Sequence, residues 1–159
     1  MFVELSATTN FTFLTGASHP EEMMAQAAEL GLPALAVADL NSVAGIVRAH
    51  SAAGEIARVQ AETGAAGTAP RLIPAALVRL DCGMEFTAIP RDRAAWGRLC
   101  RLLSLGRLRA PKGDCLLRAG DLADWAAGMD LLLHPPAATR HAEVADWRDR
   151  VARLLPRLG

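Results

Sequence analysis

The sequence predicts an α/β fold built mostly on parallel strands. Segments with strand character alternate with segments of helical apolar spacing, which is the pattern of proteins with a parallel sheet. The clearest strand, residues 32–38, is apolar without interruption, as expected of a parallel strand buried on both faces. With 159 residues and 52% hydrophobic content, the chain is long enough for one globular domain. It is too short for a complete β/α barrel, which needs about 250 residues.

The first predicted unit is a short strand followed by a helix. Residues 2–5 alternate weakly between apolar and polar side chains, which is typical of a strand. We expect Ser18 to begin the helix, because Glu21 stands three residues later and completes a capping-box pattern. The helix is expected to end at Gly31, since glycine favours the backbone conformation found at helix C-termini.

The second predicted unit ends its strand at Asp39 and continues into another helix. Asn41 or Ser42 is expected to cap that helix. His50 falls on the apolar stripe of the helix, which favours a histidine packed in the core. The helix is expected to end in the flexible segment 63–70, which is rich in glycine and alanine.

A hairpin opens the second half of the chain. Residues 71–80 and 84–89 are interpreted as two strands joined by a turn at Asp81-Cys82-Gly83, which places a hairpin near 71–89. The elements expected after it are a helix from Pro90, a basic loop at 106–113, a short helix at 120–128, a strand at 129–133 and an amphipathic helix at 142–158.

Composition excludes several classes of protein. No apolar run reaches the length of about 18 residues that a membrane span needs, and the N-terminus has no secretory signal pattern. The three cysteines, Cys82, Cys100 and Cys115, are odd in number and widely spaced. They indicate reduced thiols rather than a disulfide framework or a zinc motif. We therefore expect a cytoplasmic protein without a membrane partner.

Charge is balanced overall but unevenly distributed. Residues 91–118 hold seven arginines and one lysine against two acidic residues. This basic block is either a solvated face or a surface for an acidic partner or a phosphate backbone. Single-strand binding requires aromatic residues among the basic ones, and only Trp96 lies in the block, so direct nucleic-acid binding is not favoured. The candidate contact residues are Arg98, Arg101, Arg107, Arg109 and Lys112.

Ligands of β/α proteins meet the carboxyl ends of the strands. Ser6 and Thr8 follow the first strand, Asp39 and Leu40 end the second, and Leu77 lies in the third strand region. Asp39 is the one clear metal ligand or acid/base group among them, and a catalytic metal usually needs three or more protein ligands. Asp39 is therefore either a surviving ligand or base, or a residue that caps a helix or hydrogen-bonds at the strand end.

The histidines do not extend this set of candidates. His19 lies in the first turn of a predicted helix, and His141 lies in a loop. His134 ends a strand, but no second ligand is near it in the sequence. No phosphate-binding glycine loop and no zinc-protease or hydrolase motif is present.

Three stretches are similar to one known family. Residues 4–22, Glu-Leu-Ser-Ala-Thr-Thr-Asn-Phe-Thr-Phe-Leu-Thr-Gly-Ala-Ser-His-Pro-Glu-Glu, resemble the opening of the polymerase-and-histidinol-phosphatase (PHP) domain of bacterial C-family DNA polymerases. Residues 31–50 continue the resemblance in order, and 96–113 resemble the error-prone branch. The resemblance implies a distorted, TIM-like seven-stranded β/α barrel, of which 1–136 would form the first part, followed by a C-terminal amphipathic helix at 137–159.

The chain departs from the metal-binding members of this family. Those members carry His-x-His where this sequence has Ser6 and Thr8, Asp-His where it has Asp39 and Leu40, and a Glu near Leu77. The resemblance therefore implies a degenerate metal site, with no bound metal and Asp39 as the one plausible survivor. It implies no cofactor for this segment, and magnesium in the polymerase body of the parent.

The functional expectation follows from the resemblance. It is a segment of an error-prone DNA polymerase active in damage-induced, translesion synthesis, and the segment itself is expected to be a catalytically inactive structural and interaction module. The expected partner is the remainder of the polymerase, with the sliding clamp or accessory subunits as further candidates and DNA met through the parent. One alternative is a metal-dependent PHP phosphoesterase or 3′–5′ exonuclease, and another is a free-standing binding protein. The expected location is the bacterial cytoplasm.

Overall fold

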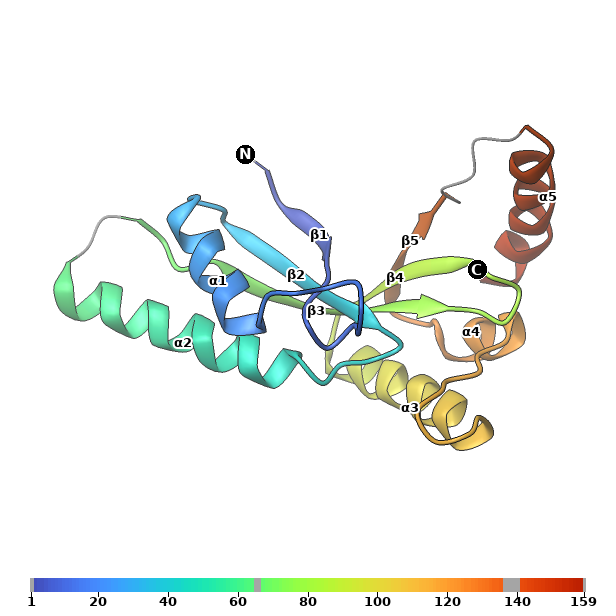
Figure 1. Cartoon of the computed structure of the whole chain (residues 1–159), viewed down its shortest axis with the longest axis horizontal. Coiled ribbons are helices and arrows are strands. Elements are labelled where there is room, and N and C mark those ends of the chain that lie inside the picture. Colours follow the sequence, from blue (N-terminus) through green and yellow to red (C-terminus); the bar gives the residue numbers. More distant parts are fainter. Residues whose placement is uncertain (1, 65–66, 136–140, 159) are drawn as a thin grey trace. The chain divides into compact units, whose positions relative to one another are not determined.

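The computed structural model describes residues 2–64, 67–135 and 141–158. Five strands and five helices follow one another in these ranges, and the strands have the order β1-β2-β3-β4-β5 in the sheet (Figure 1). The chain forms two compact units, Met1–Leu77 and Val78–Gly159. The elements are β1 (Glu4–Ala7), α1 (Pro20–Glu29), β2 (Ala34–Leu40), α2 (Ile46–Thr63), β3 (Arg71–Arg79), β4 (Glu85–Pro90), α3 (Arg93–Arg109), α4 (Ala119–Trp125), β5 (Met129–His134) and α5 (His141–Leu158).

The first unit is organised around parallel strands. β2 pairs in parallel with β1 on one side and with β3 on the other. The register between β2 and β3 is regular and pairs Leu40 with Leu77, whereas the β1–β2 register shifts between Glu4 and Ala7. β2 is buried from Ala34 to Asp39, as expected of a parallel strand covered on both faces. α1 packs against α2 and against β2.

The start of α1 differs by one residue from the prediction. His19, not Ser18, is the cap residue, and its N–H donates to Glu22 Oε2 at 2.8 Å. Pro20 then occupies the first helical position, where its missing N–H leaves no hydrogen bond unmade. The predicted pairing of Ser18 with Glu21 is therefore wrong, because the capping interaction is made one residue later.

The start of α2 also differs from the prediction. The helix begins at Ile46 after Gly45, and neither Asn41 nor Ser42 caps it. Asn41 instead adopts a φ of 47° and donates its N–H to the Leu77 carbonyl at 2.8 Å, which keeps this segment out of the helix. Ala49 is buried and His50 is exposed, so the prediction of a core histidine is wrong.

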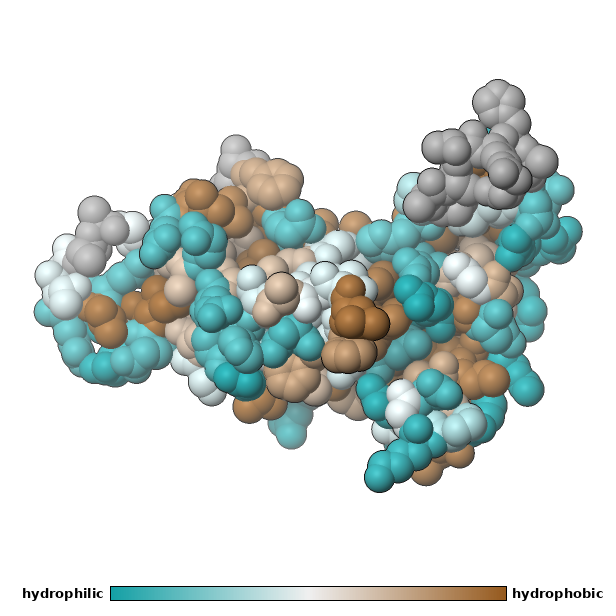
Figure 2. All heavy atoms as spheres, viewed as in Figure 1, coloured by the Kyte–Doolittle hydropathy of each residue, from teal (hydrophilic) through white to brown (hydrophobic). Residues whose placement is uncertain are grey.

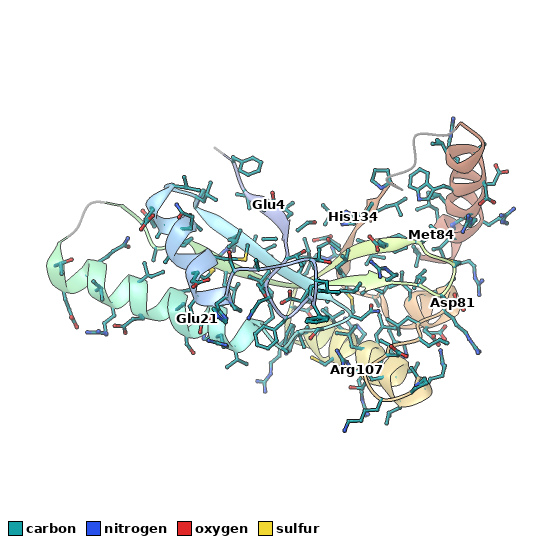
Figure 3. All side chains as sticks on the ribbon, in the orientation of Figure 1. Glu4, Glu21, Asp81, Met84, Arg107 and His134 are labelled. Atoms are coloured by element: carbon teal, nitrogen blue, oxygen red, sulfur yellow. The ribbon has the colours of Figure 1, made fainter. Side chains whose placement is uncertain are left out.

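The second unit contains the hairpin turn, and β5 runs antiparallel to β4. The Leu80 N–H donates to the Met84 carbonyl at 2.9 Å, and Gly83 in the turn has a φ of 82° (Figure 3 labels Asp81 and Met84 here). α3 begins after Asp92, whose Oδ1 accepts from the Ala95 N–H at 2.7 Å. The predicted α/β fold, with a hairpin near 71–89, is confirmed.

α3 is longer than predicted and replaces the start of the expected basic loop at 106–113. It continues through Gly106 to Arg109. A Cβ on Gly106 would lie 2.6 Å from the Leu117 side chain and 2.7 Å from Cys115 Sγ. The glycine thus allows the following segment to pack closely on the helix instead of ending it. Within the described ranges no helix has the length and apolar character required to cross a bilayer.

Candidate functional site

The candidate site is the edge of the first unit where the parallel strands end. The register places Asp39 opposite Ala76 and Leu40 opposite Leu77, so these positions lie together as the sequence suggests. Ser6 lies within β1, where its N–H donates to Glu4 Oε1 at 2.8 Å, and Thr8 directly follows the strand. Only one of the five predicted positions, Asp39, carries a carboxylate.

Asp39 is held by the segment that follows β1. Its Oδ1 accepts hydrogen bonds from the Thr9 N–H and the Thr12 hydroxyl, each at 2.8 Å. Its Oδ2 accepts from the Thr9 hydroxyl, also at 2.8 Å. The exposed fractions of Asp39, Thr9 and Thr12 are 1%, 0% and 4%. The carboxylate is therefore a buried acceptor whose negative charge is stabilised by three donors.

Thr12 links the loop to the strand end. Besides donating to Asp39, its oxygen accepts from the Leu40 N–H at 2.9 Å. The backbone of the loop closes on itself at the same place, because the Thr12 N–H donates to the Thr9 carbonyl at 2.9 Å and the Gly16 N–H donates to the Thr12 carbonyl at 3.0 Å. One side chain thus satisfies both a buried carboxylate and a strand-end amide.

Two glycines allow this arrangement by close approach. A Cβ on Gly16 would lie 2.0 Å from the Thr9 carbonyl oxygen, which no side chain can tolerate. A Cβ on Gly45, at the start of α2, would lie 2.9 Å from Asp39 Oδ2. The loop, the strand end and the helix start therefore enclose the carboxylate without space for an added carbon atom on either glycine.

Thr9 and Thr12 are the side chains that hold Asp39, and neither of them was identified as its partner from the sequence. The available signal was an acidic residue at the end of an uninterrupted apolar strand. Such a carboxylate is buried and needs donors, and the hydroxyl-rich segment after the first strand supplies them.

This set of donors does not fit a catalytic metal ion. The side chains of Leu40 and Leu77 have no lone pairs, and Ser6 and Thr8 offer neutral hydroxyls where metal sites use imidazole or carboxylate. Both carboxylate oxygens of Asp39 already accept hydrogen bonds from Thr9 or Thr12 in the segment after β1. Across the described part of the chain, no three His, Cys, Asp or Glu side chains are grouped so that they could hold a metal.

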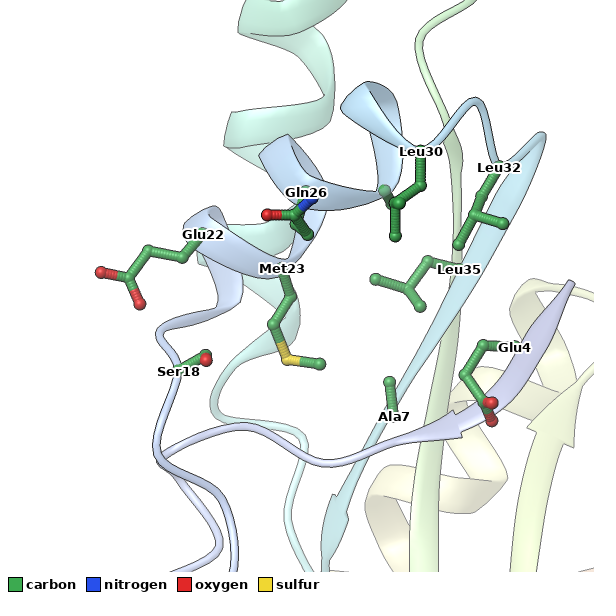
Figure 4. A pocket seen from close by; sticks show the side chains of 10 residues that line it. Glu4, Ala7, Ser18, Glu22, Met23, Gln26, Leu30, Leu32 and Leu35 are labelled. Carbon is green, nitrogen blue, oxygen red and sulfur yellow. The ribbon is translucent and has the colours of Figure 1, made fainter.

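A separate pocket lies between β1, α1 and β2 (Figure 4). Its volume is about 340 Å³, and neither Asp39, Thr9 nor Thr12 lines it. Leucine and methionine side chains, such as Met23 and Leu35, form much of its wall, and Glu4 and Glu22 add two carboxylates. The pocket therefore presents an apolar surface without a cation to receive a phosphate.

Arg98 and Arg109, which belong to the five basic candidates, make contacts within the second unit. Arg98 Nε donates to the Ala127 carbonyl at 2.6 Å, and Arg109 forms an ion pair with Asp121, with Nη2 at 3.0 Å from Oδ1. The hydrogen bond from Arg109 holds the pKa of the Asp121 carboxyl below its usual value. Arg101, Arg107 and Lys112 are exposed, and a contact role of all five residues stays a prediction (Figure 3 labels Arg107).

Hydrogen bonds or burial account for two further histidines and two of the three cysteines. His134 Nε2 lies 2.8 Å from the hydroxyl of Thr87, which is buried, and the Asn10 Nδ2 amide donates to His19 Nδ1 at 2.9 Å. Burial raises the pKa of the Cys100 thiol and, against the nearby Arg107 charge, that of Cys115. Such thiols are poor nucleophiles at neutral pH. The side chain of His141 lies outside the described residues.

Relatives with curated names are similar to this chain over most of its length. An error-prone DNA polymerase of Ruegeria pomeroyi is 46% identical over 160 residues, covering 84% of this chain and 14% of that protein. An error-prone DNA polymerase of Rhodopseudomonas palustris (strain BisB5) is 42% identical over 154 residues, covering 96% of this chain and 13% of that protein. The chain thus spans about one seventh of the length of these relatives.

The fold is shared with a solved structure. A Bifidobacterium adolescentis protein described as a metal-dependent phosphoesterase superposes with a TM-score of 0.60, covering 98% of this chain and 83% of that one. Its sequence identity is 14%, so this likeness concerns the fold alone. The family model for the PHP domain matches residues 4–132, which confirms the family expected from the sequence. Since that match covers most of the chain, the chain belongs to the PHP domain family.

Proposed function

We propose that this chain acts as the PHP-domain segment of an error-prone DNA polymerase and performs no phosphoester chemistry itself. In this proposal it is a structural and interaction module, and the remainder of the polymerase carries out damage-induced, translesion synthesis. The similarity to two error-prone polymerases, each matched over a small part of its length, supports this assignment. The polymerase body would contain the magnesium ions and meet the DNA.

The single observation that carries the inactive role is the engagement of Asp39. A general base or a metal ligand must direct a lone pair at a reactant or an ion. Asp39 is 1% exposed, and both of its oxygens accept hydrogen bonds from Thr9 or Thr12. The carboxylate therefore stabilises the loop, and this structural role is the one that its contacts support.

A phosphoesterase assay tests the inactive role. The purified chain is incubated with Mn²⁺ or Zn²⁺ and with a phosphate ester or a 3′-labelled DNA strand, and turnover is expected to equal that of the heat-denatured chain. Metal-dependent turnover that Asp39→Asn abolishes, while circular dichroism shows an unchanged fold, would overturn the proposal. That result would support the alternative, a PHP phosphoesterase or 3′–5′ exonuclease.

The interaction role is tested in a chimeric polymerase. This chain replaces the matching segment of the Ruegeria pomeroyi relative, and protease sites are placed at its junctions. After cleavage of the assembled protein, the chain is expected to remain bound to the polymerase body during gel filtration. Complete release of the wild-type chain at low salt would contradict the module assignment. The sliding clamp and accessory polymerase subunits can be added in the same assay as further candidate partners.

The basic residues make a specific contribution in this proposal. Reversing charge with Arg101→Glu and Arg107→Glu is expected to weaken retention of the cleaved chain, and the loss is expected to grow at low salt, where charge interactions are least screened. Arg93→Glu is the matched control, because Arg93 is exposed in the first turn of the same helix. Equal retention of the double variant and the control would refute the contact assignment.

A further inference from the structure

Three large apolar side chains are exposed on the loop that follows β1: Phe11 is 39% exposed, and the other two are almost fully exposed. In the 8–18 loop, which runs from Thr8 to Ser18, Phe13 is 85% exposed and Leu14 is 89% exposed. They are adjacent in sequence, and Figure 2 shows apolar surface over this part of the first unit. An exposed apolar pair of this size has an unfavourable interaction with water that burial against a partner would remove.

The loop does not reach this conformation by default. Leu14 has a φ of 62°, a left-handed conformation that side chains bearing a Cβ rarely adopt and that costs about 1–2 kcal/mol. The surrounding contacts impose it, because Thr9 and Thr12 are bound to the buried Asp39 and Gly16 lies directly against the Thr9 carbonyl. Phe13 and Leu14 are therefore presented by a preformed loop, which reduces the entropy lost when such a surface binds.

The surroundings of this pair indicate the chemistry of its partner. No Asp, Glu, Lys or Arg occurs from Leu5 to Pro20, so the loop has no cation to bind phosphate. Nucleic acid and anionic membranes are bound through such cations. Uncharged hydroxyls, among them Thr15 and Ser18, accompany the two apolar side chains. Protein–protein interfaces typically have an apolar centre surrounded by a polar rim, and the loop has this composition.

We infer that the 8–18 loop is a preformed docking element that inserts Phe13 and Leu14 into an apolar pocket of the polymerase polypeptide outside the segment that this chain matches. This inference rests on the proposed function. The Ruegeria pomeroyi relative shares only 14% of its length with this chain, so most of that polypeptide is available to supply the pocket. Covalent attachment raises the effective concentration of that surface, and the two side chains add to the other contacts of the segment, so they need not form a complete interface by themselves.

The cleavable chimera tests this inference separately from the proposed function. The double variant Phe13→Ser, Leu14→Ser is expected to leave the polymerase body at least tenfold faster than the wild-type chain after cleavage. Because the loop is uncharged, this difference is expected to be the same at low and high salt. Val47→Ser and Leu30→Ser are matched controls, since these residues are also exposed, at 72% and 66%, and they are expected to be retained like the wild type.

The experiment distinguishes failure of the inferred docking from failure of the proposed function. Retention of the wild type with fast release of the double variant supports docking through the loop. Equal retention of both overturns the inference and leaves the proposed function standing, whereas release of both contradicts the proposed function. Dimers of the isolated chain that the double variant abolishes, measured by light scattering, would identify a second copy as the occupant and would also overturn it. Circular dichroism and urea unfolding of the isolated variants verify that they fold.

Discussion

The Thr9 hydroxyl donates to Asp39 Oδ2 at 2.8 Å, although the two residues are 30 positions apart. Both side chains are shielded from solvent, at 0% and 1% exposure. A buried carboxylate is stable only when its charge is matched by donors, and here the loop after β1 provides them. The contact therefore joins the loop after the first strand to the end of the second.

Replacing the carboxylate tests how much this contact contributes. Asp39→Ala leaves the Thr9 N–H and the hydroxyls of Thr9 and Thr12 without their acceptor, and it is expected to lower the free energy of unfolding by about 3 kcal/mol. Urea unfolding followed by circular dichroism measures the change. Asp114→Ala is the control, since Asp114 is exposed, and it is expected to change stability by less than about 0.5 kcal/mol. Equal effects of the two substitutions would refute a structural role for Asp39.

Two glycine substitutions are expected to change the stability of the fold in opposite directions. Gly16→Ala forces a Cβ to within 2.0 Å of the Thr9 carbonyl oxygen, so the loop must move and stability is expected to fall by about 2 kcal/mol or more. Gly54→Ala lies inside α2 with nothing within 4 Å of the new Cβ, and it is expected to raise stability by about 0.5–1 kcal/mol. Melting temperatures of the two variants provide the comparison. A Gly16→Ala variant as stable as the wild type would contradict the close approach.

Leu14→Asn separates the stability of the loop from its proposed binding role. Asparagine tolerates the left-handed conformation better than leucine, so the isolated chain is expected to gain about 0.5–1 kcal/mol. The same substitution removes an apolar side chain that is 89% exposed, so retention in the cleaved chimera is expected to decrease. Chemical unfolding and gel filtration measure the two effects. A loss of stability would show that Leu14 makes a folding contribution instead.

The ion pair of Arg109 and Asp121 is expected to make the stability of the second unit depend on pH. The hydrogen bond from Arg109 lowers the pKa of Asp121 in the folded state. Its contribution is therefore fully present above the unfolded pKa of about 3.9, and it is lost as pH falls through the lower folded pKa. Asp121→Asn removes the charge, so the advantage of the wild type is expected to disappear in acid. Urea midpoints of both proteins between about pH 2 and pH 7 measure this, and a constant difference would contradict it.

Much of the fold could be predicted from apolar patterning, including the starts of α4 and α5 to within one residue, whereas the cap residues of α1 and α2 were predicted wrongly. The uninterrupted run at 32–38 identified β2 because a strand buried on both faces has no polar alternation. Around α1, the segment Ser18-His19-Pro20-Glu21-Glu22 contains two overlapping patterns, each with an acidic residue three positions after a candidate cap. The preference of proline for the first helical position would have favoured His19.

The candidate site was predictable only in part. A carboxylate ending a buried strand indicated that Asp39 matters, and parallel pairing indicated that Leu40 and Leu77 lie near it. The role of Thr12 depends on a contact across 27 positions, which no local pattern contains. His50 is exposed because α2 buries the face that carries Ile46 and Ala49, and Val47, which lies three positions before His50 on the same face, is 72% exposed.

The bonds that hold the 8–18 loop join Thr9 and Thr12 to a residue 30 and 27 positions later in the chain. The loop therefore cannot acquire its shape until β1 and β2 have aligned, because its acceptor arrives with the end of β2. Contacts between residues this far apart in the sequence require the loss of loop-closure entropy before they form, so we expect the loop to order together with or after the two strands. Pulse-labelled hydrogen exchange during refolding can test this order, because the Thr9 amide is expected to become protected only once β1 and β2 have paired.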